Sequence, residues 1–359
     1  MRIITVNYYS VLIFLSVLVS ACKESELDKI EFNSFKEEIK LESKSLNITE
    51  YYRMVDLEII DTFLIVINSH TTDNFVSLFH KDKLNLITTF CPRGKGPHEI
   101  YYVGTHAMDE ENRTINIIDW EKNILWQYEI DSVLNNNKYK PSFILSFPQK
   151  YFPVQDLVIY NEEKLYGIPH PEDSLILLFN QSGKETSSFG NNLIARKSIN
   201  YNNYNTPFSS KLDRYFARIN HNINKMVVAY IYFDILSIYD LNYENSVINM
   251  SGPDEIDYKE QLQLENNTYY GYFNPPHFDD KYIYILYHGH KGFSWVDNNA
   301  VLYYPNEIFM FDWAGTPLRR ITLDHSICSF ALDKEKQRII AFTLDQEMSF
   351  IEYNLNEFY

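Results

Sequence analysis

Residues 54–90, MVDLEIIDTFLIVINSHTTDNFVSLFHKDKLNLITTF, decide the fold. They contain four short apolar or alternating runs rich in Ile, Phe and Val, a composition typical of β-strands. Short polar segments separate the runs and are typical of turns. The stretch therefore predicts one sheet of four strands, at Met54–Ile60, Phe63–Asn68, Phe75–Lys81 and Leu84–Phe90.

The same pattern recurs along the rest of the chain. We expect a second group of strands at Gly104–Met108, Thr114–Asp119, Ile124–Ile130 and Ser142–Phe147, and a third at Val154–Tyr160, Lys164–Pro169, Leu175–Asn180 and Glu185–Phe189. The fourth lies at Tyr215–Asn220, Met226–Tyr232, Ile235–Leu241 and Ser246–Met250, and the fifth at Thr268–Phe273, Lys281–Tyr287, Glu307–Trp313 and Leu318–Leu323. A sixth group has only three strands, Ile327–Leu332, Arg338–Leu344 and Met348–Leu355. Polar turns recur between first and second strands, at Asp109–Arg113, Asn161–Lys164, Asn220–Asn224, Asp279–Lys281 and Asp333–Gln337.

Six repeats of this kind predict an all-β protein, a six-bladed β-propeller of four-stranded antiparallel blades. A seven-bladed ring with one unrecognised blade is the alternative. The N-terminal stretch from Ile30 to Leu46, which alternates at Ile30–Phe32 and Ile39–Leu41, can supply the strand that the sixth blade lacks. Pairing of the two chain ends would close the ring and leave no open array of sheet edges. We therefore expect residues 30–359 to form a single domain.

Composition narrows the choice of partners. The 359 residues include 32 Lys and Arg against 48 Asp and Glu, and the net charge of -16 would repel a phosphate backbone. The 29 Tyr and 24 Phe favour strands. We therefore expect no nucleic-acid partner, and we expect a monomer.

The N-terminus carries an export signal. A positive start at Met1-Arg2 precedes a nearly continuous apolar run at Ile3–Ser20, and small residues lead to a cysteine in Val19-Ser20-Ala21-Cys22. This resembles the lipobox of bacterial lipoproteins, which implies that residues 1–21 are cleaved, that Cys22 is acylated, and that residues 22–29 tether the domain to the outer membrane. A single transmembrane helix is the alternative, but the run is short and lacks a basic flank. Lys23-Glu24-Ser25-Glu26 resembles the surface-export tag of Bacteroidota lipoproteins, so the anchored domain faces the cell surface or, alternatively, the periplasm.

Two cysteines remain if Cys22 carries lipid. Cys91 and Cys328 could form a disulfide, which export permits, or could be two separate small apolar residues, which we favour.

Three segments resemble one family. Arg93-Gly94-Lys95-Gly96-Pro97-His98-Glu99-Ile100 is similar to the Gly-x-Gly-Pro-x-Glu junction of TolB-like six-bladed propeller lipoproteins, and the segments Tyr282–Gly289 and Ile308–Pro317 look like that family's fifth blade. The resemblance implies the fold and an envelope location but no reaction. The family often has a second glycine after the proline, where this chain has His98.

Long connections gather on one face of the predicted ring. By strand order, Cys91–Val103, Gly190–Arg214, Ser251–Asn267 and His288–Asn306 must emerge on the same side. Long loops commonly carry binding residues, and these contain cations and aromatic rings that suit sugars or anionic chains. The ligand-binding candidates are Arg93, Lys95, Tyr201, Tyr204, Phe293 and Trp295. Alternatively, these residues only pack their own loops.

Motifs for catalysis are absent from the sequence. His288 and His290 are the closest histidine pair, without a third ligand at metal spacing, and no nucleophile elbow or phosphate loop occurs. We therefore predict no catalytic residue, metal or cofactor, and a non-catalytic binding module for a glycan, peptide or envelope protein. The alternatives are a propeller hydrolase or lyase with a metal in the central channel, and a scaffold for an envelope complex. Asp131-Ser132-Val133 and Asp173-Ser174-Leu175 resemble Bacteroidota O-glycosylation acceptors.

Overall fold

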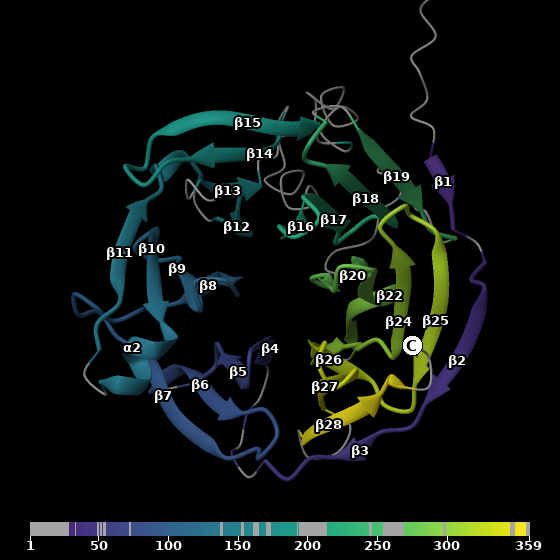
Figure 1. The fold of residues 1–359 in the computed structure, drawn as a ribbon, viewed down its shortest axis with the longest axis horizontal. Coiled ribbons are helices and arrows are strands. Elements are labelled where there is room, and N and C mark those ends of the chain that lie inside the picture. Colours follow the sequence, from purple (N-terminus) through teal and green to yellow (C-terminus); the bar gives the residue numbers. More distant parts are fainter. Residues whose placement is uncertain are drawn as a thin grey trace, which may run out of the picture.

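The strands form six sheets arranged around one axis (Figure 1). The computed structural model describes residues 29–356, except 33, 49, 51, 53–54, 72, 137–138, 152–153, 161–164, 170–173, 192, 194–213, 244–245, 254–268, 297–298 and 345–348. The predicted six-bladed all-β propeller is confirmed, and the seven-bladed alternative is wrong. No helix within the described ranges is long and apolar enough to cross a membrane, and the predicted signal segment lies outside them.

Blades 1 to 3 each contain four antiparallel strands in sequence order from the axis outward. Blade 1 consists of β4 (Val55–Ile60), β5 (Phe63–Asn68), β6 (Asn74–His80) and β7 (Leu86–Pro92). Blade 2 consists of β8 (Val103–Asp109), β9 (Thr114–Asp119), β10 (Ile124–Glu129) and β11 (Ser142–Ser146). Blade 3 consists of β12 (Val158–Ile159), β13 (Tyr166–Pro169), β14 (Ser174–Phe179) and β15 (Glu185–Asn191).

Blades 4 to 6 each include a strand from the N-terminal stretch at their outer edge. Blade 4 consists of β16 (Tyr215–Asn220), β17 (Lys225–Tyr230), β18 (Ile235–Asp240) and β19 (Val247–Ser251), with β1 (Lys29–Glu31) outside them. Blade 5 consists of β20 (Tyr269–Phe273), β21 (His277–Phe278), β22 (Tyr282–Val296), β23 (Asn299–Leu302), β24 (Glu307–Asp312) and β25 (Pro317–Leu323), with β2 (Glu37–Leu41) outside them. Blade 6 consists of β26 (Ile327–Asp333), β27 (Arg338–Thr343), β28 (Ser349–Asn354) and β3 (Lys44–Ser45).

The N-terminal stretch, residues 29–46, is a strap along the rim of three blades (Figure 1). The expected fourth strand of blade 6 is β3, which pairs with β28 and is extended by a bond from the Leu46 amide to the Phe350 carbonyl. The closure of the ring by an N-terminal strand is therefore confirmed. The alternating Ile30–Phe32 and Ile39–Leu41 segments do not make this pair, because they lie parallel to β19 and β25 instead.

Apolar side chains join the strap to the blades it crosses. Phe32 is buried against Phe311, with ring centroids 5.2 Å apart, and Phe35 packs on Phe309 at 4.7 Å. Leu41 is buried in the core between blades 5 and 6. Burial of such side chains, at about 1.5–3 kcal/mol each, explains why the strap follows the rim.

Apolar cores fill the spaces between neighbouring blades. The second and third strands are the most apolar, as in FLIVIN of β5, because both faces of these strands contact a neighbouring blade. One cluster joins blades 1 and 2, another blades 2 and 3, a third blades 3 to 5, a fourth blades 5 and 6, and a fifth blades 6 and 1. The cores thus form a closed ring.

The predicted polar turns share one chemistry. In four of the five predicted turns, the Asp or Asn at the start accepts a bond from an amide two or three residues later, as Asp109 does from Asn112 and Asp333 from Lys336. The fifth predicted turn, Asn161–Lys164, lies outside the described residues. The last residue takes a left-handed conformation in the turns that end at Arg113, Asn224 and Gln337. These turns lie at one end of the ring, called here the turn face. The connections between blades lie at the other end, called the loop face.

Three features differ from or extend the sequence prediction. A short helix, α2 (Ile130–Asn135), follows β10 because Ile130 and Val133 are buried, and a single 3-10 turn occupies Gln149–Tyr151. The expected loop at His288–Asn306 is wrong, because β22 continues to Val296 and forms a hairpin with β23. Cys91 and Cys328 lie in β7 and β26 as free cysteines, so the disulfide alternative is also wrong.

Candidate functional site

The glycine-rich junction between blades 1 and 2 is a self-contained loop. Glu99 folds back so that its Oε2 accepts a 2.7 Å hydrogen bond from the Gly96 amide. A Cβ on Gly94 or Gly96 would overlap this carboxyl group. Lys122 from blade 2 donates to the carbonyl oxygens of Gly96, at 3.0 Å, and Glu99. The Gly-x-Gly-Pro-x-Glu pattern therefore has a structural explanation, because the glycines leave room for the carboxylate.

The two candidate cations in this loop are exposed. Arg93 donates to the Thr71 carbonyl at 2.6 Å and lies 5.9 Å from the centroid of the Phe75 ring. Lys95 lies 4.9 Å from the centroid of the Tyr101 ring. Both remain available on the loop face, but each also has a partner inside its own loop region.

The structure places the other predicted residues unequally. Phe293 and Trp295 belong to β22, where their backbones pair with Leu302 and Ala300 of the hairpin. Tyr201 and Tyr204 lie outside the described residues, as does Cys22. The four described candidates therefore belong to two segments, the junction loop and β22, and a common binding role for all six stays a prediction.

The two predicted glycosylation serines are half-buried. Ser132 lies in α2, where its hydroxyl donates to Glu129 at 2.9 Å, and Ser174 is the first residue of β14. Their modification stays a prediction.

An unexpected cluster of ionisable side chains lies around the axis, on or beside the innermost strands. Five blades contribute to this cluster, which we call the axial cluster. Its members are Asp56 and Glu58 of β4, His106 of β8, Asp156 before β12, Arg218 of β16 and His277 of β21.

Asp156 is fixed in the axial cluster by an ion pair and two further hydrogen bonds. Asp156 is 1% exposed, and its two carboxylate oxygens lie 3.1 and 3.0 Å from Nη1 of Arg218. It also accepts bonds from the Ala217 amide at 2.9 Å and the Thr105 hydroxyl at 3.2 Å. This ion pair fixes the guanidinium beside the axis.

Glu58 pairs with a histidine of the neighbouring blade. Its Oε1 lies 3.5 Å from Nε2 of His106. Burial alone would raise the pKa of Glu58, but the hydrogen bond from His106 and nearby positive charges lower it to about 2. Glu58 is therefore charged at neutral pH, and 22% of its side chain is exposed.

Asp56 and His277 complete the axial cluster. The protein around Asp56 excludes enough water to raise its pKa, although the charges of His106 and Arg218 oppose the shift. The residue is nevertheless exposed, so solvent reaches the innermost strand here. Burial lowers the pKa of His277 to about 4 against the opposing effect of Glu58, so its ring is neutral at pH 7.

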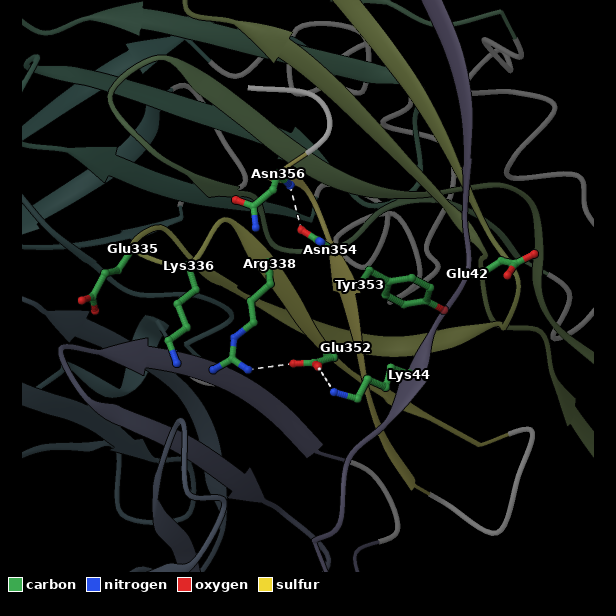
Figure 2. A pocket seen from close by; sticks show the side chains of 9 residues that line it. All are labelled: Glu42, Lys44, Glu335, Lys336, Arg338, Glu352, Tyr353, Asn354 and Asn356. Carbon is green, nitrogen blue, oxygen red and sulfur yellow. Dashed lines mark hydrogen bonds and ion pairs between the residues drawn. The ribbon is translucent and has the colours of Figure 1, made fainter.

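A hollow with a volume of about 630 Å³ lies on the outer side of blade 6 (Figure 2). The strap lines one side of it with Glu42 and Lys44, and β27, β28 and the turn before β27 line the other. Its charged residues are three glutamates and three cations, and most of them already pair with each other or with blade 1. This balance indicates a structural role.

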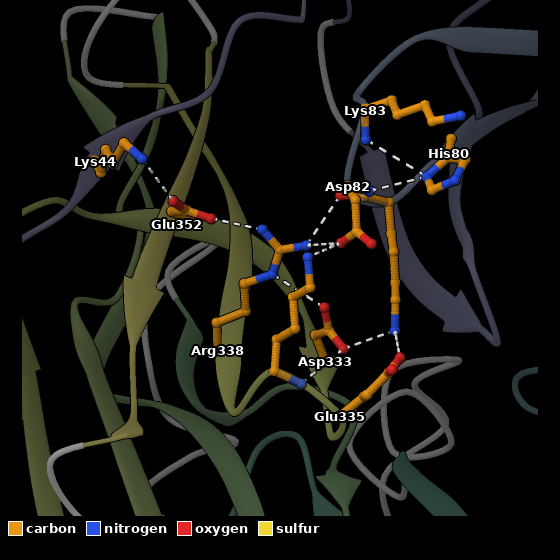
Figure 3. A network of polar contacts seen from close by, with 10 residues as sticks. Lys44, His80, Asp82, Lys83, Asp333, Glu335, Arg338 and Glu352 are labelled. Atoms are coloured by element: carbon orange, nitrogen blue, oxygen red, sulfur yellow. Dashed lines mark hydrogen bonds and ion pairs between the residues drawn. The ribbon is translucent and has the colours of Figure 1, made fainter.

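The pairs belong to a network at the seam between blades 6 and 1 (Figure 3). The side chain of Lys81 in blade 1 is 3% exposed, and its ammonium lies 2.9 Å from Asp333 and 3.0 Å from Glu335 in blade 6. Arg338 donates to Asp333, Glu352 and Asp82 at 2.7–3.0 Å. Lys44 of the strap reaches Glu352 at 3.4 Å. The network therefore ties the strap and the two end blades together.

Sequence reasoning missed the axial cluster, although a weak signal was present. Asp56 and Glu58 interrupt the apolar VDLEII run, and Arg218 interrupts YFARIN. A charged residue in a strand with one buried face can either line the axis or face the outer solvent. The sequence does not separate these two cases, because the position of the strand in the closed ring decides between them. Within the described ranges, no three His, Cys, Asp or Glu side chains are grouped closely enough to hold a metal ion.

Comparison with known proteins places the fold in a family. The model of the TolB-like 6-blade propeller-like family matches residues 31–335. This chain belongs to the TolB-like six-bladed propeller family. The TolB-like fold is shared with a member of the DUF4221 family from Bacteroides vulgatus, at a TM-score of 0.55 and 9% identity over 88% of this chain and 95% of that chain. It is also shared with a protein from Bacteroides fragilis that is described as exported, at a TM-score of 0.52 and 10% identity over 88% and 98% of the two chains. No curated protein matches this TolB-like propeller.

The junction loop yields a stability prediction. We expect Gly94→Ala to lower the free energy of unfolding by about 1.5–3 kcal/mol, because the new methyl group displaces Glu99 from the Gly96 amide. Lys95→Ala, in the same loop but exposed, is the control and should change it by less than about 0.5 kcal/mol. Urea denaturation measures both, and equal effects would contradict the structural explanation of the motif.

The seam network yields a second prediction. Asp333→Asn should cost about 3 kcal/mol at pH 7, because it removes the buried carboxylate that pairs with both Lys81 and Arg338 and leaves Lys81 with only the exposed Glu335. Hydrogen bonds from Lys81 and Arg338 outweigh burial and lower the pKa of Asp333. The stabilisation is therefore complete above the ordinary Asp pKa of about 4 and is lost as pH falls through the lower folded-state pKa. The difference between variant and wild type should shrink in the same acid range.

The control is Lys334→Ala, which removes an exposed pair with Glu110 at 3.0 Å and should cost less than about 1 kcal/mol. Urea denaturation at several pH values separates the two. A cost for Asp333→Asn no larger than that of the control would disprove the role of the seam network.

Proposed function

We propose that this protein is a lipid-anchored lipoprotein of the cell envelope whose propeller binds a ligand without catalysing a reaction. The axial cluster is the observation that carries the binding role, because six ionisable residues from five blades meet where solvent reaches the inner strands. A rigid ring that holds polar groups in fixed positions is suited to selective binding.

The charges of the axial cluster favour a ligand with hydrogen-bond donors. The cluster has three carboxyl groups but only one guanidinium, which Asp156 already neutralises. Asp56 and the remaining acceptor capacity of Glu58, which also pairs with His106, are proposed to accept bonds from a ligand. Glycan hydroxyls and peptide amino groups have this chemistry, so a glycan, a peptide or a segment of an envelope protein is the proposed partner.

The acid–base properties of Glu58 and His277 suit binding better than proton transfer. A general acid or base works best when its pKa lies near the operating pH. The pKa values of Glu58, about 2, and His277, about 4, lie well below neutrality. These two groups are fixed as an acceptor and a neutral ring at pH 7.

The loop face would complete the binding surface. Arg93, Lys95, Phe293 and Trp295 all come from segments that strand order assigns to this face. Tyr201 and Tyr204 belong to the connection between β15 and β16 and are proposed to join them.

The proposed location follows from the N-terminal sequence. Acylation of Cys22 would anchor a monomeric propeller to the outer membrane through residues 22–29, facing the cell surface or the periplasm. A family of envelope propellers and the export signal support this assignment.

A binding screen tests the function. A soluble fragment that starts after Ser25 is applied to glycan and peptide arrays, and the best ligand is titrated. We expect Glu58→Gln to weaken binding about tenfold, equivalent to about 1.4 kcal/mol, because the amide lacks the negative charge. The control is Glu121→Gln, because Glu121 is exposed and does not belong to the axial cluster. Equal affinities for wild type and Glu58→Gln would argue against the axial cluster as the binding site.

Trp295→Ala tests the loop face separately. It should weaken the same interaction while the thermal unfolding temperature stays nearly unchanged. A large loss of stability would show that Trp295 only packs within its hairpin.

Cys22→Ala tests the anchor when residues 1–21 of the variant are replaced by an export signal that is cleaved without an acylated cysteine, so that the apolar Ile3–Ser20 run cannot itself hold the variant in the membrane. Because acyl chains supply the membrane affinity, the variant should move from the membrane fraction to the soluble envelope fraction. Retention in the membrane after washing would contradict the proposed lipid anchor.

A further inference from the structure

The direction of the first strand shows from which side the tether reaches the ring. β19 runs from the turn face to the loop face, because it follows the hairpin after β18 and precedes the connection to blade 5. β1 lies parallel to it, with Lys29 opposite Asn249 and Glu31 opposite Ser251. The chain therefore joins blade 4 at the end of β1 that points toward the turn face.

The tether is too short to place the membrane elsewhere. The seven residue steps from Cys22 to Lys29 span at most about 25 Å when fully extended. Blade 1 lies across the ring from blade 4 (Figure 1). An acylated Cys22 can therefore be no more than about 25 Å from the end of β1 that points toward the turn face of blade 4.

The turn face of blade 4 presents an aromatic residue at this edge. Tyr243 lies in the turn between β18 and β19, where its amide donates to the Asp240 carbonyl. It is 69% exposed, the highest fraction among the exposed large hydrophobic residues described. Its neighbour Asn242 accepts a bond from Asn224 of the adjacent turn at 2.6 Å and donates to the Asp240 carboxylate at 3.0 and 3.1 Å.

An exposed tyrosine suits the bilayer interface, and here it lies between the acidic residues Asp240 and Glu244 of the sequence. Tyrosine places its ring at the boundary of the acyl chains and its hydroxyl in water. The protein's net charge of -16 gives no general attraction to an anionic surface, so contact would depend on the tether and on this aromatic edge.

We propose that the turn-face edge of blade 4 around Tyr243 lies against the bilayer and that the loop face points away from it. This inference rests on the proposed lipid anchor at Cys22. It leaves the loop face, with Arg93 and Lys95, open to partners outside the membrane.

Photocrosslinking of the full lipoprotein tests this orientation. A photoreactive benzoyl-phenylalanine replaces Tyr243 in one protein and Lys83 in a matched protein. Lys83 is the control because it is exposed in a turn-face hairpin of blade 1, across the ring. Both proteins are reconstituted into phosphatidylcholine and phosphatidylethanolamine vesicles that contain a fluorescent lipid, and are then irradiated.

We expect several-fold more fluorescent lipid attached at position 243 than at position 83. Equal labelling, or more labelling at position 83, with Cys22 shown by mass spectrometry to be acylated, would overturn the orientation and leave the lipid anchor standing. An N-terminal peptide without acyl chains, from protein that does not stay with the vesicles, would overturn both.

Discussion

The packing of blade 6 on blade 1 is the interaction on which the rest of the structure depends. Five blade boundaries are made between sheets that follow one another along the chain, but this one joins its two ends. Phe79 and Leu57 of blade 1 share a core with Phe342 and Phe350 of blade 6. The buried Lys81–Asp333 pair fixes how the two blades align, because a shift of one blade against the other would separate two buried charges. Without the seam, two blade faces would be open to water.

The strap links this closure to the proposed membrane attachment and to the binding site. It covers the outer edges of blades 4 to 6 and ends as the closing strand, so the segment proposed to carry the anchor also completes the ring. Closure in turn fixes the distance between innermost strands. Residues as far apart in the sequence as Glu58 and His277 then share one electrostatic environment at the axis. The same scaffold leaves the loop face free for longer connections.

Apolar runs bounded by polar turns were sufficient to predict most strands from the sequence. Contacts between blades that form only when the ring closes were not predictable in this way. Phe63–Asn68, Thr114–Asp119 and Tyr215–Asn220 have the predicted bounds because apolar runs end at definite polar turns. The two-residue β3 has exposed side chains and no alternation to reveal it, since backbone bonds to β28 hold it. The β22–β23 hairpin was mistaken for a loop because the polar sequence Asp297-Asn298-Asn299 stood among long connections. The axial cluster was missed because charged residues reveal a common site only when their strands are placed around one axis.

Thermal unfolding of two proteins that are shortened at the N-terminus tests most directly whether the strap closes the ring. One fragment begins at residue 29 and retains all three strap strands, and the other begins at residue 47 and lacks them. The first should unfold in one cooperative transition at the temperature of the mature protein. The second should unfold at a markedly lower temperature, with exposed apolar surface that binds a hydrophobic dye. Identical unfolding temperatures for the two fragments would contradict the account.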